Sequence, residues 1–391
     1  MKVLDVYLVN VNFFNGSIFI AVIIEVTFAL LLFFGRKKNQ VANRFLSLML
    51  LIIAAWMFWT VSLGLGLNSY FPILNVIPFT YSLAMGPAIY FYVKKLCQPQ
   101  VKLSKATLWH FLPVCFELLV HFTNVVVADA QGIAFKKTFI FLTVYPLIQL
   151  ASIASIATYI YYSFRLLKQF DVFLKNNFSD YVKYQLLWLR RLLVVFICYE
   201  LCWLPYTLVD YLLFDFKLSI ESYYPLHMMI SIIGIWLAVE SFLNPDSLVD
   251  QTLTNKNDDE LAASEQKISS QENKTLNWLV EEMEQQHYYL DADLNLSTLA
   301  KALDLHPNLL SRLLNKGLDK CFADFVNEYR INAVIIKLAD NKYQQMTLLD
   351  IAFNSGFNSK TTFNRIFKKF TGDTPLNYRK TLKNNEQQLA I

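Results

Sequence analysis

Residues 347–379 read TLLDIAFNSGFNSKTTFNRIFKKFTGDTPLNYR and decide the fold of the C-terminal part of the chain. Thr347 and Asp350 have the spacing of a capping box, which begins a helix. Gly356 predicts the end of that helix, because a left-handed turn suits glycine best. Ser359 is placed to cap a following helix. The stretch therefore predicts two helices joined by a tight turn.

The second of these helices has two different faces. Apolar residues recur at i, i+3, i+4 and i+7 and predict one buried face: Phe363, Ile366, Phe367 and Phe370. Polar and basic residues cover the rest of the surface: Lys360, Thr361, Asn364, Arg365 and Lys368. Gly372 ends this helix, and Thr374-Pro375 begins a third with proline at its first position. Taken alone, such a helix is typical of a solvated outer face.

The whole string resembles the second helix-turn-helix of the AraC/XylS family of bacterial transcription regulators. The matching residues are Ile351, Ala352, Gly356, Phe357, Ser359, Phe363, Arg365, Phe367, Lys368, Lys369, Gly372, Thr374, Pro375, Tyr378 and Arg379. The resemblance implies sequence-specific binding to double-stranded promoter DNA. It also implies RNA polymerase as a partner and a homodimer as a candidate state.

The residues before this string predict the rest of an α-helical DNA-binding domain over 274–383. One helix is expected over about 274–289 and a short one from Ser297. His306, at the end of a turn, is expected to cap a helix that has Pro307 at its first position, which gives a first helix-turn-helix. A long helix over 322–340 resembles the linker helix that joins the two subdomains in the family. On it, Arg330 is expected to bond to a neighbouring turn or to a phosphate.

A recognition helix reads base edges from the major groove with its first turns. By resemblance, the base-facing candidates are Asn308, Ser311 and Arg312 in the first helix and Lys360, Thr361 and Asn364 in the second. The candidates for phosphate contacts are Arg365, Lys368 and Lys369, since such contacts position the protein without specifying a base. Residues 351–385 hold seven basic residues and one acid, which is the local charge that a DNA face requires.

The N-terminal part, residues 1–245, is unusually apolar. Residues 45–93 contain no Asp, Glu, Lys or Arg, which leaves room for two bilayer spans of ~20 residues each. We predict a seven-helix transmembrane bundle with spans at about 12–34, 45–66, 72–93, 108–127, 138–163, 190–214 and 225–243. The fold class is thus all-α throughout.

The basic residues of the short loops set the orientation of this bundle. Loops 35–44, 94–107 and 164–191 hold 14 Lys and Arg, against 4 in the N-terminus and the alternate loops. The N-terminus is therefore expected outside, and the C-terminal domain in the cytoplasm of a bacterial cell, below its inner membrane. Residues 164–189 are expected to form a helix on the inner leaflet or an extension of the fifth span; a docking surface for the DNA-binding domain is the alternative.

Ionisable residues within the spans are candidates for an intramembrane ligand or coupling site: Glu117, His121, Glu200 and Asp210. Glu117 and His121 stand at i and i+4, so they are placed to pair. The alternative is that these residues pair with one another as structural contacts. We expect no metal site, because one His and scattered acids define no coordination geometry.

Residues 246–273 carry seven acids and two lysines and predict a flexible linker, and 384–391 form a tail. The sequence holds no nucleophile elbow, no HExxH and no glycine-rich phosphate loop. We therefore predict no catalytic residues, no cofactor and no enzymatic activity.

The sequence as a whole predicts a membrane-embedded one-component regulator that senses a small-molecule or protein signal in contact with membrane lipid. The main alternative is a bundle that is a passive anchor, or a partner-binding subunit controlled by a separate sensor or transporter. A bundle that is itself a transporter or an enzyme is the weaker alternative, because the sequence lacks catalytic motifs.

Overall fold

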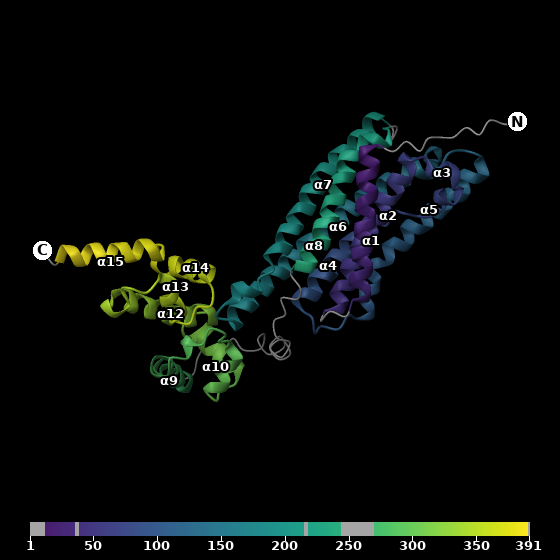
Figure 1. Cartoon of the computed structure of the whole chain (residues 1–391). Helices are drawn as coiled ribbons and strands as arrows, with labels where there is room; N and C mark the ends of the chain where they lie inside the picture. Colours follow the sequence, from purple (N-terminus) through teal and green to yellow (C-terminus); the bar gives the residue numbers. More distant parts are fainter. Residues whose placement is uncertain (1–11, 36–38, 215–217, 244–269, 390–391) are drawn as a thin grey trace. The chain divides into compact units, whose positions relative to one another are not determined.

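Figure 1 shows the computed structural model, which describes residues 12–35, 39–214, 218–243 and 270–389. Within these ranges the regular elements are helices, and the one strand-like contact is an antiparallel bridge between Phe178 and Asn295. The prediction of an all-α fold is therefore confirmed for the described part of the chain. These residues form two compact units, the first within 1–167 and 186–246 and the second within 168–185 and 247–391.

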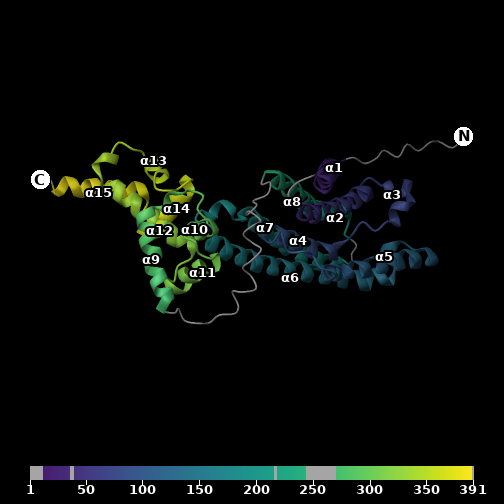
Figure 2. The same ribbon diagram turned by 90° about the horizontal axis from the view of Figure 1, so that it is seen from below.

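The first unit is built from long apolar helices. They are α1 (Phe13–Phe34), α2 (Gln40–Gly64), α4 (Ser82–Cys97), α5 (Leu112–Gln131), α6 (Phe139–Asn177), α7 (Leu187–Phe214) and α8 (Tyr224–Leu243). A short helix, α3 (Leu67–Tyr70), and 3-10 segments of three to seven residues lie between them. Helix α1 lies against α2 and α8, as Figures 1 and 2 show from two sides.

Six helices among the described residues are long and apolar enough to cross a membrane. The predicted third span, 72–93, does not form as one helix: residues 72–75 make a 3-10 turn and α4 begins only at Ser82. Pro78 fits the break at residues 76 and 77, because proline disfavours helix at the residue before it. The 16 residues of α4 span about 24 Å, less than the ~30 Å of a bilayer core.

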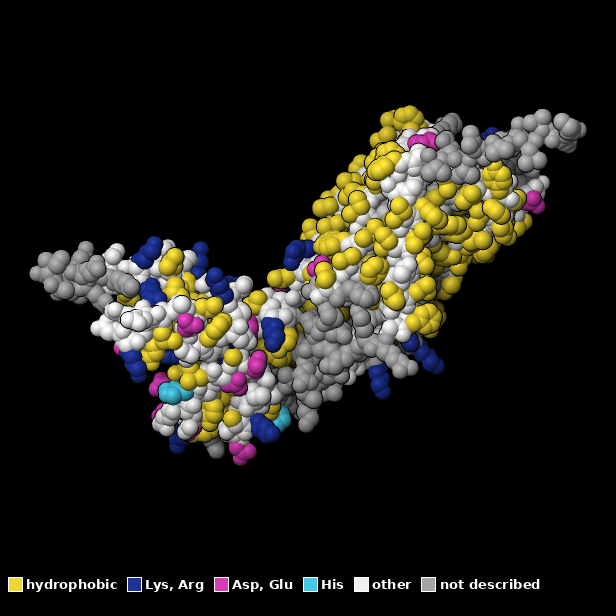
Figure 3. Space-filling model, viewed as in Figure 1, with side chains coloured by type: hydrophobic (Ala, Val, Ile, Leu, Met, Phe, Trp, Pro, Cys, Tyr) yellow, Lys and Arg dark blue, Asp and Glu magenta, His cyan; other side chains and the backbone are white. Residues whose placement is uncertain are grey.

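The outward faces of the first unit are apolar. Figure 3 shows hydrophobic side chains covering its helices. Large exposed side chains on α1, α5 and α7 include Ile20, Leu31, Leu119, Val126, Leu201 and Leu212. Apolar surface of this extent is unusual on a protein in water and is typical of one that meets lipid.

The second unit contains the predicted DNA-binding domain. Its helices are α9 (Ser270–Gln286), α10 (Leu296–Ala302), α11 (Pro307–Arg312), α12 (Phe322–Ala339), α13 (Leu348–Phe353), α14 (Lys360–Thr371) and α15 (Pro375–Leu389). One π-helical turn, Leu313–Gly317, extends α11. The predicted linker helix is confirmed as α12, although 246–269 of the predicted flexible linker lie outside the described residues.

Two hydrophobic cores share α12. Its first half contributes Phe322, Phe325 and Val326 to a core with α9, α10 and α11. Its second half contributes Ile331 and Val334 to a core with α13 and α14. One continuous helix therefore fixes the spacing of the two helix pairs, α10–α11 and α13–α14.

Candidate nucleic-acid interface

The turn between α13 and α14 has the local geometry that the sequence predicts. The Thr347 hydroxyl donates to Asp350 Oδ2 at 2.6 Å, and the Asp350 amide donates back to Thr347 Oγ1 at 3.1 Å. Gly356 has a φ of 92°, in the left-handed region. Ser359 Oγ accepts from the Thr362 amide at 3.1 Å and caps α14. These contacts hold the start of α14 in one orientation.

Helix α14 buries one face and exposes the other. Phe363, Ile366 and Phe367 are at most 1% exposed, whereas Phe370, predicted on the same face, is 37% exposed. The six DNA-contact candidates of this helix are all exposed: Lys360, Thr361, Asn364, Arg365, Lys368 and Lys369. Lys369 Nζ lies 2.5 Å from Asp324 Oδ1, so its charge is partly neutralised. The exposed face thus offers amide, hydroxyl and cationic groups together.

The DNA-contact candidates on α11 are less exposed than those on α14. His306 caps α11 as predicted, with Nδ1 accepting from the Asn308 amide at 3.3 Å. Asn308, Ser311 and Arg312 are half-buried. The Arg312 guanidinium pairs with the carboxylate of Glu272 on α9. The sequence analysis placed Glu272 in the flexible linker and therefore did not predict this ion pair. A base contact by Arg312 would have to break the pair.

Arg330 at the middle of α12 joins the two halves of the unit. It is 1% exposed, and its Nε donates to Tyr289 O at 2.8 Å and its Nη2 to Asp291 O at 2.7 Å. Of the two predicted roles, bonding to a neighbouring turn is therefore the one the structure shows. Burial lowers the pKa of the Arg330 guanidinium to about 10, and the nearby carboxylates of Asp180, Asp291 and Asp293 oppose this shift. The group is therefore charged at neutral pH.

Gly356 lets the α13–α14 turn approach this network. A Cβ at Gly356 would lie 2.2 Å from Tyr289 O and 2.9 Å from Arg330 Nε. The Phe357 ring lies 5.8 Å below the Arg330 guanidinium. The two helix pairs are thus held together by backbone contact as well as by α12.

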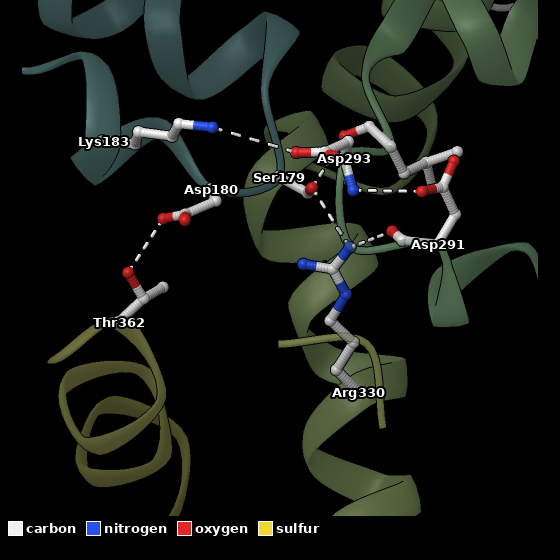
Figure 4. A network of polar contacts seen from close by, with 8 residues as sticks. Ser179, Asp180, Lys183, Asp291, Asp293, Arg330 and Thr362 are labelled. Carbon is white, nitrogen blue, oxygen red and sulfur yellow. Dashed lines mark hydrogen bonds and ion pairs between the residues drawn. The ribbon is translucent and has the colours of Figure 1, made fainter. Parts of the chain in front are cut away.

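A third set of contacts to this network comes from residues 178–184, between α6 and α7. Figure 4 shows Ser179 and Asp180 of this segment beside Arg330 and Thr362. The extension of the fifth span is observed, because α6 continues to Asn177. The segment after it contacts α12 and α14, which the sequence offered only as the alternative.

In the first unit, the four intramembrane candidates lie at two cavities. Glu117 and Glu200 line one of about 150 Å³, and His121 and Asp210 line another of about 440 Å³. The Glu117–His121 pair does not form. Instead Glu117 accepts from Ser82 N and Oγ at 3.0 and 2.9 Å, and His121 Nδ1 lies 3.2 Å from the Tyr145 hydroxyl.

Residues 299–381 match a family model described as a helix-turn-helix domain. An uncharacterised HTH-type transcriptional regulator, YtdP, of Bacillus subtilis (strain 168) is 33% identical over 93 residues, which is 24% of this chain and 12% of that protein. Another, SAS0078 of Staphylococcus aureus (strain MSSA476), is 37% identical over 87 residues, 22% of this chain and 11% of that protein.

The porin thermoregulatory protein EnvY of Escherichia coli (strain K12) is 37% identical over 94 residues, 24% of this chain and 33% of that protein. No solved structure matches the chain. The chain thus spans only about one-tenth of the length of the first two relatives. The residues that the family model matches, 299–381, lie in the second unit.

The second unit is therefore a helix-turn-helix domain of the kind that binds double-stranded DNA. This match agrees with the resemblance of its motif to AraC-type regulators, and two of the relatives are themselves named HTH-type transcriptional regulators. This class consists of DNA-binding proteins and not of enzymes, which agrees with the lack of catalytic motifs in the sequence.

Proposed function

We propose that the chain is a transcription regulator embedded in the bacterial inner membrane, with a promoter-binding second unit and a first unit that senses a signal. The observation that carries the proposal is the exposed face of α14, where Lys360, Thr361 and Asn364 stand in its first turns above a buried aromatic face. Asn and Lys side chains at such positions pair with the edges of adenine and guanine in the major groove. RNA polymerase and a second copy of the chain stay proposed partners.

The proposed topology has seven spans, with α4 as the third. Although α4 is short, Ala88, Ile89 and Val93 are at most 1% exposed, so it is enclosed by other helices. The irregular residues 76–81 before α4 are half-buried or exposed, so the proposed topology places them at the membrane surface, because irregular backbone is not tolerated where it faces lipid. Together with the excess of Lys and Arg in alternate loops, this supports an outer N-terminus and a cytoplasmic second unit.

This topology is tested with reporters that are active on one side of the membrane only. A periplasmic reporter inserted after Gly132, in the proposed outer loop, is expected to be active, and the same reporter after Ile391 is expected to be inactive. A cytoplasmic reporter should give the opposite pattern. Activity of the periplasmic reporter at Ile391 would place the second unit away from the chromosome and end the proposal.

For the sensing role we propose the two cavities of the first unit as the ligand site. Trp56, Tyr145 and Gln149 line both cavities, which are therefore neighbours. Among the described residues, Glu200 Oε2 and the buried Tyr199 hydroxyl find no hydrogen-bond partner. Because a buried polar atom without a partner is costly, these atoms favour a ligand with an apolar body and hydrogen-bond donors.

Glu117→Gln and Glu200→Gln are each expected to raise the inducer concentration for half-maximal reporter response by about ten-fold or more. Each substitution removes the charged acceptor of a proposed charge-assisted hydrogen bond to the inducer. Thr123→Ala is the matched control on α5: Thr123 is exposed, and its hydroxyl donates to the Leu119 carbonyl of its own helix. A response unchanged in both glutamine variants would favour the passive anchor.

The anchor alternative also predicts the behaviour of residues 270–391 alone. The fragment should begin at Ser270, because a later start removes Glu272, the partner of Arg312. If the bundle restrains the second unit, the fragment regulates the same promoters without a signal. If the bundle only anchors, adding any unrelated membrane anchor to the fragment restores regulation that no longer depends on the inducer.

A further inference from the structure

The segment 178–184, here called the docking loop, packs through its own side chains against the helices of the second unit, to which it belongs. Phe178, Ser179, Asp180 and Tyr181 are each at most 8% exposed. Phe178 forms the antiparallel bridge with Asn295, and Ser179 Oγ donates to Leu294 O at 2.7 Å. A loop that merely connected two helices would keep such residues in solvent.

Ser179 also enters the network around Arg330 (Figure 4). Asn327 Nδ2 donates to Ser179 O at 3.0 Å, and Arg330 Nη2 donates to Ser179 Oγ at 3.2 Å. Asn327 and Arg330 are themselves at most 1% exposed. The docking loop is therefore built into the centre of the unit, between its two helix pairs.

The next two residues reach α14. Asp180 Oδ1 accepts from Thr362 Oγ1 at 2.8 Å, in the first turn of the helix. The Tyr181 hydroxyl accepts from Arg365 Nη1 at 2.8 Å, and the Arg365 guanidinium lies 4.7 Å from the centre of the Tyr181 ring. Both contacts use groups that suit DNA: the N-terminal turn of a helix and an exposed arginine attract phosphate.

We infer that the docking loop and DNA compete for α14, so that the docked structure is an autoinhibited state of the regulator. The inference rests on the proposed function, in which Arg365 contacts a phosphate. Tyr181 occupies the Nη1 donor of Arg365 that a phosphate would also use, and the Asp180 carboxylate repels phosphates from the first turn of α14.

The docking loop also connects the second unit to the helices that line the proposed ligand cavities. It is continuous with α6 on one side and α7 on the other. Tyr145 and Gln149 of α6 and Glu200 of α7 line the cavities of the first unit. A ligand that shifts α6 against α7 would change how the loop between them is held, and hence the fraction of docked molecules.

The first test measures binding of a fluorescent duplex of random sequence to the full chain in lipid nanodiscs, at one low salt concentration. Replacing Asp180 and Tyr181 together by alanine is expected to tighten binding about ten-fold. This is the change expected if roughly one-tenth of the wild-type molecules are undocked and competent to bind DNA. Lys183→Ala is the matched control, since Lys183 of the same loop pairs only loosely with Asp293, at 4.0 Å. Its affinity should match the wild type.

A second pair of variants locks the loop reversibly. Asp180→Cys with Thr362→Cys places two thiols where the side chains now touch. Oxidation is expected to lower the duplex affinity about ten-fold or more, and a reductant should restore it. Each single cysteine variant controls for the five native cysteines and should not respond to the oxidant.

The outcomes separate this inference from the function on which it rests. Equal affinity of the wild type and the alanine variant, or a crosslinked protein that binds as well as the reduced one, would overturn the competition. Failure of the two cysteines to crosslink would contradict the docked contact itself. Absence of duplex binding in every variant, reduced and at low salt, would instead reject the DNA-binding function and the inference with it.

Discussion

Gly356→Ala is expected to abolish DNA binding by separating the two helix pairs of the second unit. The new methyl group meets two penalties: a left-handed φ of 92° and an approach of 2.2 Å to Tyr289 O. The first costs roughly 1–2 kcal/mol. The second acts on backbone, which has no rotamer to change, and would displace the acceptor of Arg330 Nε. Together we expect at least about 3 kcal/mol, a large part of the stability of a domain.

Gly372→Ala is the control that isolates the backbone strain. Gly372 ends α14 with a φ of 80°, but a Cβ there meets no atom within 4 Å. We expect it to cost only the left-handed strain, roughly 1–2 kcal/mol. Hydrogen exchange of α13 and α14 in the full protein measures both effects. Equal loss of protection in the two variants would show that close approach at Gly356 does not hold the unit together.

Asn364→Ala and Lys368→Ala are expected to weaken promoter binding in two different ways. Asn364 is proposed to read a base, so its loss should cost ~1–3 kcal/mol at one base pair and relax the preference there. Lys368 is proposed to contact a phosphate, so its loss should weaken all sequences alike. It should also make the slope of log affinity against log salt shallower by about 0.9.

Binding isotherms over a salt series, with the promoter duplex and single-base variants of it, distinguish the two effects. Lys342→Ala is the control, since Lys342 is an exposed lysine outside α11 and α14. Equal specificity of the Asn364 variant and the wild type would remove Asn364 from the reading positions. An unchanged salt slope for the Lys368 variant would remove Lys368 from the phosphate contacts.

The local structure of the α13–α14 pair was predictable because short-range chemistry determines it. The capping box of Thr347 and Asp350, the left-handed Gly356 and the apolar spacing around Phe363 depend on residues within a few positions of each other. The long helix α12 was predicted over 322–340 by its resemblance to the linker helix of the family. Phe370 departs from the pattern because the core beneath α14 ends before it reaches that last turn.

What the sequence did not reveal depends on contacts between distant positions. Arg365 meets Tyr181, and Thr362 meets Asp180, across more than 180 positions of sequence. No local sequence feature distinguishes Glu272 from the other acids of the linker, yet it pairs with Arg312. Likewise, i and i+4 spacing allowed Glu117 to pair with His121, but backbone amides at the start of α4 offered the carboxylate more hydrogen bonds.

The central claim is that a membrane-embedded chain binds specific promoters through α14, and mapping its chromosomal occupancy in living cells tests it most directly. The full-length protein is predicted to occupy a small set of promoters, and Asn364→Ala at equal abundance in the membrane fraction is predicted to lose most of that occupancy. A wild-type protein without discrete sites, or a variant with an identical pattern, would contradict the claim.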